Sequence, residues 1–370
     1  MHPDYPLHDI EGIPSPALLI FPEKVRRNVK KLIAMARGAD RLRSHVKTHK
    51  MPDLVRLVEG LGITKHKCAT IAEAEMIAQA GGTDVFIAYP AVGPTPARLA
   101  RLMTRYPSTT FRAAVDDPDA AEALSRAVVK VGRRLPTLLD LDVGMGRTGI
   151  EPGDAAADLY RRLADLPGLE PDGFHAYDGH HHHASLDERR AAVHASTEPV
   201  FHLREQLEAE GLPVPRLILG GTPTFPVHAE WTEPGVECSP GTCVLHDISY
   251  ATKFPDLTFE HAALILGRVI SRPRTGRLCI DIGYKAVAAD PVGPRMRFLD
   301  VPEATLGPQS EEHQVVDTPH AADFPPGTPV LAIPTHVCPS CAHYSEALAV
   351  EAGRVVARWP VTARDRVLIE

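Results

Sequence analysis

The sequence has no long apolar run. None of its hydrophobic stretches approaches the roughly 18 residues that a membrane-spanning helix needs. Its first residues, MHPDYPLHDIEG, also lack a charged segment followed by an apolar one, which is the pattern of a secretion signal. These two absences predict a cytoplasmic protein that is neither secreted nor embedded in a membrane.

Cysteine and excess positive charge are also scarce. The 370 residues include six scattered cysteines, which is typical of free or metal-bound thiols rather than of a disulfide framework. A formal net charge of -7 gives no basic field for non-specific nucleic-acid binding. One segment, RLRSHVKTHK at residues 41–50, is locally basic. A nucleic-acid-binding role for this segment stays a minor alternative.

Strand-like and helical patterns alternate from about residue 17 to 245. This alternation predicts parallel strands joined by crossover helices. Eight runs fit strands, which favours a closed (β/α)8 TIM barrel, and no G-x-G-x-x-G follows the first run, which disfavours a dinucleotide-binding sheet. The runs are ALLIF, LRSHVKT, KHKCAT, DVFIAYP, TFRAAVD, TLLDLDVG, GFHAYDG and RLILGG. Beyond residue 245, β-rich runs between Pro- and Gly-rich turns predict a mostly β domain.

Reactive side chains stand at the predicted strand ends, where β/α barrels place their active sites. Lys47 ends the second run, and Arg147 follows LLDLDVG. Tyr177 and the histidine run 180–183 follow GFHA. The histidines could form a solvated loop, but their place after a barrel strand favours a role in a site.

Two glycine loops follow the last strands of the predicted barrel. Their backbone N–H groups and hydroxyls can hold a phosphate, although each loop alone could be an ordinary turn. A lysine at the same barrel mouth is partly desolvated and close to other cations, here His45 and His49 if they are protonated. Both effects favour the neutral, nucleophilic amine on Lys47. Lys47 would otherwise be an ordinary surface lysine, but beside phosphate loops it suggests pyridoxal phosphate.

A second constellation lies in the β domain. The stretch PTHVCPSCAHY places His336 and Cys338 two positions apart, and imidazole with thiolate suits zinc or another transition metal. Two protein ligands leave positions open for water or substrate, as a catalytic metal requires. The alternative joins Cys338 to Cys341 as a CxxC pair for redox chemistry or structural zinc, which is a weak signal without a second pair.

Seven motifs occur in order along the chain: RSHVKTHK, LDVGMGRTGI, HAYDGH, LGGT, ECSPGT, SEEH and PTHVC. Together they resemble the D-threonine aldolase and D-serine dehydratase family, which comprises fold-type III pyridoxal phosphate enzymes related to alanine racemase. The resemblance runs from about residue 13 to 365. It implies a cofactor-binding barrel of the alanine racemase type at 17–245 and a β domain at 246–370 that residues 1–16 join. It also implies a homodimer with its active sites at the interface.

The resemblance also implies roles for single residues. Lys47 matches the Schiff-base lysine, Arg147 matches an arginine near the cofactor ring, and Tyr177, His180 and His182 match residues near the reacting hydroxyl. His336 and Cys338 match a pair that binds a divalent metal, which is Zn²⁺, Mn²⁺ or Mg²⁺. The residues that match the phosphate loops are Gly220, Gly221, Thr222, Gly241 and Thr242.

The implied reaction is that of a lyase on D-β-hydroxy amino acids. HAYDGH is more similar to the aldolase branch, so we rank D-threonine aldolase, which releases glycine and an aldehyde, first. His336-x-Cys338 is similar to the dehydratases, whereas the aldolases carry His-x-Asp, so D-serine dehydratase is the alternative. Residues 237–240 lack the arginine that pairs with the cofactor in racemases, so racemisation is not expected. A non-catalytic pyridoxal phosphate carrier is the third interpretation, which the metal pair disfavours.

Overall fold

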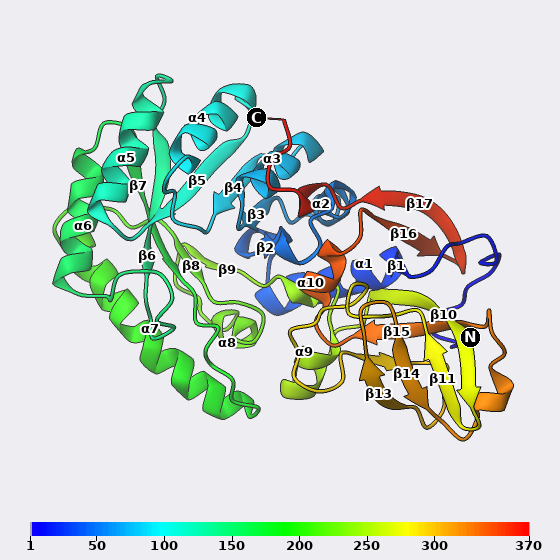
Figure 1. Ribbon diagram of the computed structural model, residues 1–370. Coiled ribbons are helices and arrows are strands. Elements are labelled where there is room, and N and C mark those ends of the chain that lie inside the picture. Colours follow the sequence, from blue (N-terminus) through cyan, green and yellow to red (C-terminus); the bar gives the residue numbers. More distant parts are fainter. Residues whose placement is uncertain (1, 370) are drawn as a thin grey trace. The chain divides into compact units, whose positions relative to one another are not determined.

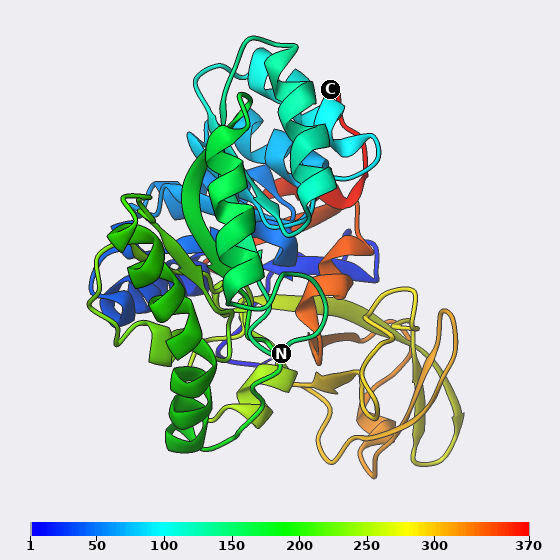
Figure 2. The same cartoon turned by 90° about the vertical axis from the view of Figure 1, so that its left-hand side faces the viewer.

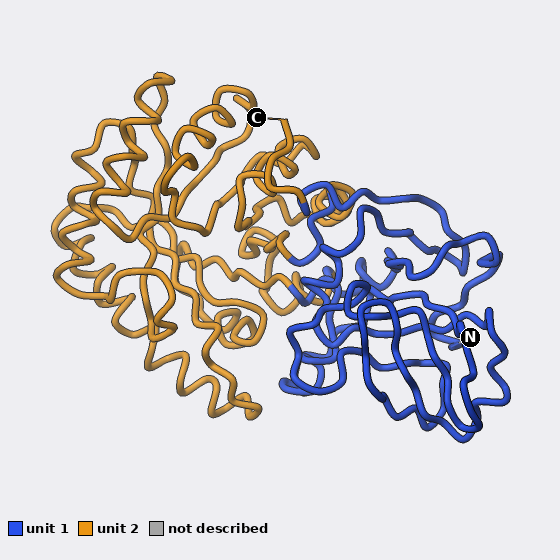
Figure 3. The backbone as a smooth tube through the Cα atoms, viewed as in Figure 1, with its two compact units in different colours: residues 1–29, 48–51, 242–364 blue, residues 30–47, 52–241, 365–370 orange. Residues whose placement is uncertain are grey.

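The computed structural model describes residues 2–369 and contains two compact units (Figure 3). Unit 1 comprises residues 1–29, 48–51 and 242–364, and unit 2 comprises residues 30–47, 52–241 and 365–370. No helix within residues 2–369 is long and apolar enough to cross a membrane. The predicted domain ranges 17–245 and 246–370 stay a prediction.

Unit 2 is built on a parallel sheet of eight strands in the order β2 to β9. A parallel bridge between Leu42 and Cys238 joins the two edges of this sheet, and the backbone N–H of His45 donates to the carbonyl of Pro240 at 3.0 Å. The sheet therefore closes as a barrel, and the predicted (β/α)8 fold is confirmed. The strands are β2 (Arg43–His45), β3 (Lys65–Cys68), β4 (Asp84–Ile87), β5 (Thr110–Val115), β6 (Leu135–Leu141), β7 (Leu169–Ala176), β8 (Leu217–Leu219) and β9 (Val236–Cys238).

Helices flank the strands of unit 2 on the outside in both views (Figures 1 and 2). Local sequence sets their ends. The side chain of Thr70 accepts from the backbone N–H of Glu73 and caps α3, and Asp117 caps α5 directly before Pro118. Gly81 ends α3 at a φ of 104°, a left-handed conformation that favours glycine. The helices are α2 (Pro52–Glu59), α3 (Ile71–Ala80), α4 (Thr95–Arg105), α5 (Pro118–Val129), α6 (Asp154–Asp165), α7 (Leu186–Ala209) and α8 (Phe225–His228).

Unit 1 contains a nine-stranded sheet whose main path is β13-β14-β11-β10-β1-β16-β17, while β15 pairs with both β10 and β12. Leu264 and Leu266 of β10 pack in one buried apolar cluster and Ile265 packs in another, because successive strand residues point to opposite faces. The predicted mostly β domain is confirmed. The strands are β1 (Ala17–Ile20), β10 (Ala263–Arg274), β11 (Arg277–Ile280), β12 (Met296–Phe298), β13 (Thr305–Gln309), β14 (Gln314–Asp317), β15 (Pro329–Pro334), β16 (Glu346–Glu351) and β17 (Arg354–Pro360), and the short helices are α9 (Ile248–Lys253) and α10 (Val337–Ala342).

One strand lies in a different sheet from the one that the sequence predicts. ALLIF is predicted as the first barrel strand, but β1 pairs antiparallel with β10 and parallel with β16 in unit 1. The eighth barrel strand is β9 instead. The strand and the helix after it, α1 (Pro22–Ala36), are real elements, but a strand before an amphipathic helix looks the same in sequence whichever sheet it joins.

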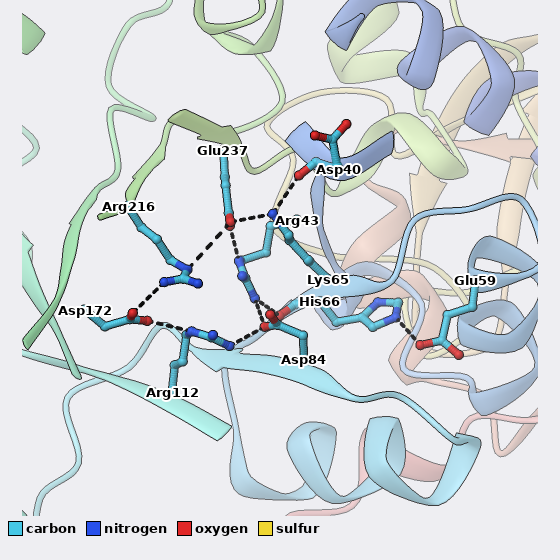
Figure 4. A network of polar contacts seen from close by, with 10 residues as sticks. All are labelled: Asp40, Arg43, Glu59, Lys65, His66, Asp84, Arg112, Asp172, Arg216 and Glu237. Carbon is cyan, nitrogen blue, oxygen red and sulfur yellow. Dashed lines mark hydrogen bonds and ion pairs between the residues drawn. The ribbon is translucent and has the colours of Figure 1, made fainter. Parts of the chain in front are cut away.

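Charges of opposite sign alternate near the N-terminal ends of the barrel strands (Figure 4). Arg43, the first residue of β2, is fully buried and donates from Nε to Glu237 and from Nη1 to Asp84, both at 2.6 Å. Arg112 joins Asp84 to Asp172, again at 2.6 Å each. Because Arg43 lies on β2 and Glu237 on β9, this charge network ties the first barrel strand to the last. Its other cations are Lys65 and Arg216.

Candidate active site

Three basic side chains lie near the ring of Tyr177 at the C-terminal ends of the barrel strands. The Nζ atoms of Lys47 and Lys67 lie 5.8 Å and 5.7 Å from the ring centroid, and the guanidinium carbon of Arg147 lies 4.6 Å from it. Lys47 stands in a 3-10 turn directly after β2, Lys67 on β3, Arg147 in the loop after β6, and Tyr177 after β7. The structure thus brings together three residues that the sequence singles out and adds Lys67 to them.

Lys67 is a buried lysine that was not predicted as a site residue from the sequence. Its exposed fraction is 3%. Burial, followed by the nearby ammonium of Lys47, lowers the pKa of Lys67 to about 7. At neutral pH, Lys67 therefore exists to a large extent as a neutral amine. The signal that could have found it is its place in KHKCAT, the run directly after the strand that leads to Lys47.

His45 does not supply a positive charge beside Lys47, which the sequence analysis considered for the case of a protonated imidazole. Burial, followed by the charges of Lys47 and Lys67, lowers the pKa of His45 well below its ordinary value. Its Nδ1 also accepts a hydrogen bond from the backbone N–H of Lys47 at 3.3 Å. The condition that His45 be protonated is therefore not met, and His45 does not favour the neutral form of Lys47 by its charge. The basic side chains that share the Tyr177 ring with Lys47 are Lys67 and Arg147.

Two buried carboxylates lie close to this cluster, and each is paired with a histidine. Asp140 Oδ1 lies 2.6 Å from Nδ1 of His175. Asp178 Oδ2 lies 2.7 Å from Nε2 of His228, and Asp178 Oδ1 accepts from the hydroxyl of Thr224 at 2.6 Å. Burial opposes ionisation, but these partners and nearby cations hold the pKa of both carboxyls below its ordinary value. Sequence reasoning missed both pairs, since only the fold brings the partners together.

The glycine loop after β8 is packed too closely for any side chain. A Cβ at Gly220, whose φ is 70°, would lie 2.3 Å from the ring of His228. A Cβ at Gly221 would lie 2.8 Å from the ring of Tyr177. The backbone of this loop therefore comes directly against the Tyr177 ring, as a cradle for a flat, phosphate-bearing cofactor requires.

A hydroxyl without a partner stands beside the two glycine loops. Ser239 Oγ is buried and has no hydrogen-bond partner within residues 2–369. The backbone N–H of Gly241 donates to Thr222 Oγ1 at 3.2 Å, which joins the two loops that the sequence singles out. A buried hydroxyl normally has a hydrogen-bond partner, so the Ser239 hydroxyl fits a bound anion beside these loops. The loops, the orphaned Ser239 and the cations around Tyr177 together fit pyridoxal phosphate, and Ser239 is a donor that sequence reasoning missed.

The histidine run 180–183 follows β7. His180 Nε2 lies only 3.2 Å from the place where a Cβ at Gly144 would stand, so His180 lies against the loop that carries Arg147. His181 is buried, whereas His182 is exposed. Burial, followed by its histidine neighbour, lowers the pKa of His181 below its ordinary value. The catalytic roles of His180 and His182 stay predictions.

His336 and Cys338 lie in unit 1, where β15 passes into α10. His336 is the N-cap residue of α10, and its Nδ1 lies 2.6 Å from Oδ2 of Asp290. The thiol of Cys338 donates to Oγ1 of Thr48 at 3.3 Å, and Thr48 is the residue that follows Lys47 in the chain. The backbone N–H of Val337, the residue between His336 and Cys338, donates to Oδ2 of Asp247 at 3.1 Å.

This pair has the donor chemistry of an open metal site. Burial lowers the pKa of His336, but interactions with Cys338 and Asp290 outweigh it and raise that pKa to about 9. Within residues 2–369, no three His, Cys, Asp or Glu side chains gather as a metal-binding group. An imidazole and a thiolate fit a divalent metal whose other positions stay open, and a carboxylate on the second ring nitrogen is the usual partner of a metal-binding histidine. None of the six cysteines forms a disulfide within residues 2–369, and burial raises the pKa of Cys341.

Comparison with known proteins supports one family. Residues 20–243 match the alanine racemase N-terminal domain, and residues 262–350 match a serine dehydratase domain. The chain is 30% identical to a 3-hydroxy-D-aspartate aldolase of Paracoccus denitrificans, over 98% of this chain and 95% of that protein. It is 29% identical to a D-threonine aldolase of an Arthrobacter species, over 98% and 96%. The chain belongs to the D-threonine aldolase and D-serine dehydratase family.

A solved structure of this family has the same fold as this chain. It is the D-threonine aldolase of Filomicrobium marinum, with a TM-score of 0.89 and 30% identity over 97% of each chain. The chain is also 25% identical to a D-threo-3-hydroxyaspartate dehydratase of a Delftia species, over 93% of this chain and 96% of that protein. Aldolases and dehydratases are both lyases, so the prediction of a pyridoxal phosphate-dependent lyase is confirmed.

Proposed function

We propose that this chain is a pyridoxal phosphate- and divalent metal-dependent lyase that cleaves D-threonine or a close D-β-hydroxy analogue into glycine and an aldehyde. The observation that carries the proposal is the convergence of Lys47, Lys67 and Arg147 on Tyr177 at the catalytic end of the barrel. Relatives that are named aldolases, similar over nearly their whole length, support this choice of reaction.

The barrel residues would hold the cofactor. Lys47 would provide the amine for its aldehyde, and the loops 220–222 and 239–242 would donate to its phosphate. When bound, pyridoxal phosphate supplies an electron sink for the charge that develops at Cα. Arg147 and Tyr177 would fix the orientation of the ring, since the guanidinium already lies 4.6 Å from the phenol ring.

The metal pair would act on the substrate hydroxyl. His336 and Cys338 would hold a divalent ion, Zn²⁺, Mn²⁺ or Mg²⁺, which supplies a Lewis acid for the β-oxygen. Asp290 would keep the imidazole of His336 in one orientation through Nδ1, which leaves Nε2 for the metal. His180 or His182 would accept the proton of the hydroxyl.

A dehydratase is the second candidate. The observation that favours it is the thiol at Cys338, where the sequence resemblance expects a carboxylate in aldolases. In that reaction Lys47 would take the proton from Cα and hydroxide would leave from Cβ. The two reactions need the same side chains and differ in which bond at Cα the bound substrate aligns with the cofactor ring.

We also propose that the protein is a homodimer, as the family resemblance implies. Its six scattered cysteines, none of which forms a disulfide within residues 2–369, favour a cytoplasmic location. Light scattering of the purified protein measures its mass directly, and a monomer at working concentration would contradict this part of the proposal.

Incubation of the cofactor- and metal-loaded protein with D-threonine is expected to yield glycine and acetaldehyde in equal amounts. Amino-acid chromatography and a coupled aldehyde assay measure the two products, and L-threonine serves as the stereochemical control. Pyruvate and ammonia from D-serine, or oxaloacetate and ammonia from D-threo-3-hydroxyaspartate, would instead establish the dehydratase. If none of these substrates gives a product while the cofactor stays bound, the result would favour the third interpretation, a non-catalytic pyridoxal phosphate carrier.

Asp290→Asn is expected to weaken divalent-metal binding about 10- to 100-fold, because partners of the second ring nitrogen contribute that much to metal affinity. Titration calorimetry with Zn²⁺ or Mn²⁺ measures the change. Glu303→Gln is the matched control, since Glu303 also holds a histidine at 3.2 Å, but that histidine, His320, is not one of the proposed metal ligands. Unchanged affinity in Asp290→Asn would show that His336 does not depend on this carboxylate.

A further inference from the structure

Two threonine hydroxyls lie against the thiol of Cys338 within unit 1. The thiol donates to Oγ1 of Thr48 at 3.3 Å, and Oγ1 of Thr242 lies 3.6 Å from Sγ of Cys338. Thr48 is 0% exposed and Thr242 is 5% exposed, so both threonines are shielded from water. The contacts of Cys338 are therefore made by buried hydroxyls rather than by mobile surface side chains.

Both threonines stand where the chain passes from one compact unit to the other. The chain leaves unit 2 and enters unit 1 at Thr48, and it does so again at Thr242. The residue directly before Thr48 is Lys47, the proposed cofactor lysine, and the residue directly before Thr242 is Gly241, in the second glycine loop. One peptide bond thus joins each threonine to a residue of the proposed cofactor site.

Hydrogen bonds within unit 1 hold the segment that carries the metal pair. The carboxylate of Asp247, which is fully buried, accepts from the backbone N–H of Val337 at 3.1 Å. The hydroxyl of Ser340 donates to the backbone carbonyl of His336 at 2.7 Å. Cys338 therefore meets the two threonines from a fixed position in the β domain.

We propose that Thr48 and Thr242 are positioning residues that couple the metal site to the cofactor site, so that each ligand strengthens the binding of the other. The thiolate is the form of cysteine that binds a metal, and it can only accept hydrogen bonds. Both hydroxyls can then serve Sγ only as donors, which fixes their orientation and restrains the backbone beside Lys47 and Gly241. A ligand whose site is already ordered loses less conformational freedom, so it binds more tightly. The inference rests on the proposed cofactor and metal sites, but not on which lyase reaction follows.

Equilibrium dialysis of the full chain against graded pyridoxal phosphate, with Zn²⁺ or with a chelator, measures the coupling. We expect Zn²⁺ to strengthen cofactor binding at least about fivefold, which is the lower end of the usual coupling between two sites. Titration calorimetry with Zn²⁺, with and without the cofactor, should return the same factor, because the coupling of two binding equilibria is reciprocal. Thr48→Val keeps the shape of the side chain but removes its hydroxyl, so the factor should fall below about twofold.

Two variants separate the hydrogen bond from packing. Thr48→Ser retains a hydroxyl at the same position and should keep most of the wild-type coupling. Thr137→Val is the matched control, since Thr137 is also fully buried but donates to the backbone carbonyl of Leu135, at 2.9 Å, and it should keep the full factor. Thr48→Ala removes the same hydroxyl and takes the place of Thr48→Val if that variant does not fold.

Equal coupling in Thr48→Val and the wild type would overturn the proposal, because the metal and the anionic cofactor would then attract each other without the hydroxyl. So would an equal loss in Thr48→Val and Thr48→Ser, which would indicate packing, or independent binding of the two ligands in the wild type. These results leave the proposed function intact, since both ligands still bind. A wild type that binds no cofactor, or none through Lys47, would instead reject the proposed function and this inference with it.

Discussion

Replacing Lys47 with alanine is expected to remove the normal covalent link to the cofactor and to lower kcat by at least about 10⁴-fold. Removing the nucleophile from an enzyme that works through covalent catalysis costs on the order of 10⁶-fold in kcat. The smaller figure is expected here because a second neutral amine, Lys67, lies at the same ring and can partly replace the lost one.

Borohydride reduction measures this prediction without relying on turnover. In the wild type, reduction followed by peptide mapping should place the cofactor on the peptide that contains Lys47. Lys50→Ala, a change in the same basic segment, should keep both the colour and the activity. The assignment is wrong if the wild-type adduct maps to another lysine, or if Lys47→Ala keeps the wild-type spectrum and rate.

The barrel was predictable from sequence because its strands and helices alternate in a repeating pattern. The error at ALLIF has a physical cause: β1 is apolar and precedes an amphipathic helix, so it has the local signature of a barrel strand although it pairs with β10 and β16. The true eighth strand, β9, contains only three residues, one of which is Glu237. Pro234, Gly235 and Pro240 flank this run, so in sequence it has the pattern of a loop, and only the pairing with β8 defines it as a strand.

The site was predictable only where a motif carried it. Lys47, Arg147 and Tyr177 lie in recognisable motifs, and the structure gathers them at one ring. Lys67 was missed because KHKCAT reads as a polar, solvated strand, whereas closure of the barrel buries this side chain completely enough to change its pKa. Asp290 was missed because 46 positions separate it from His336 in the chain.

Arg43→Leu is expected to lower the free energy of unfolding by about 3–5 kcal/mol, because it leaves buried carboxylates without their main cation. Arg43 has an exposed fraction of 0% and bridges Glu237 to Asp84 at 2.6 Å each. Chemical denaturation at neutral pH measures the loss. Arg43→Lys keeps the charge but cannot bridge both carboxylates in the same plane, so an intermediate loss is expected.

Acid should reduce the difference between the wild type and Arg43→Leu. Burial alone would raise the pKa of Glu237, but Arg43 and Lys65 outweigh it and hold that pKa below its ordinary value. A carboxyl whose folded-state pKa is lowered stabilises the protein above its unfolded-state pKa, and this stabilisation is lost as the pH falls through the folded-state value. The wild type therefore loses more stability on acidification than Arg43→Leu, in which Glu237 lacks its main partner.

Arg161→Leu removes an arginine that also bridges two carboxylates but lies at the surface, so it should change stability far less. Equal losses in these two variants, or a difference that does not narrow in acid, would show that burial of the charge network does not govern the stability of the barrel.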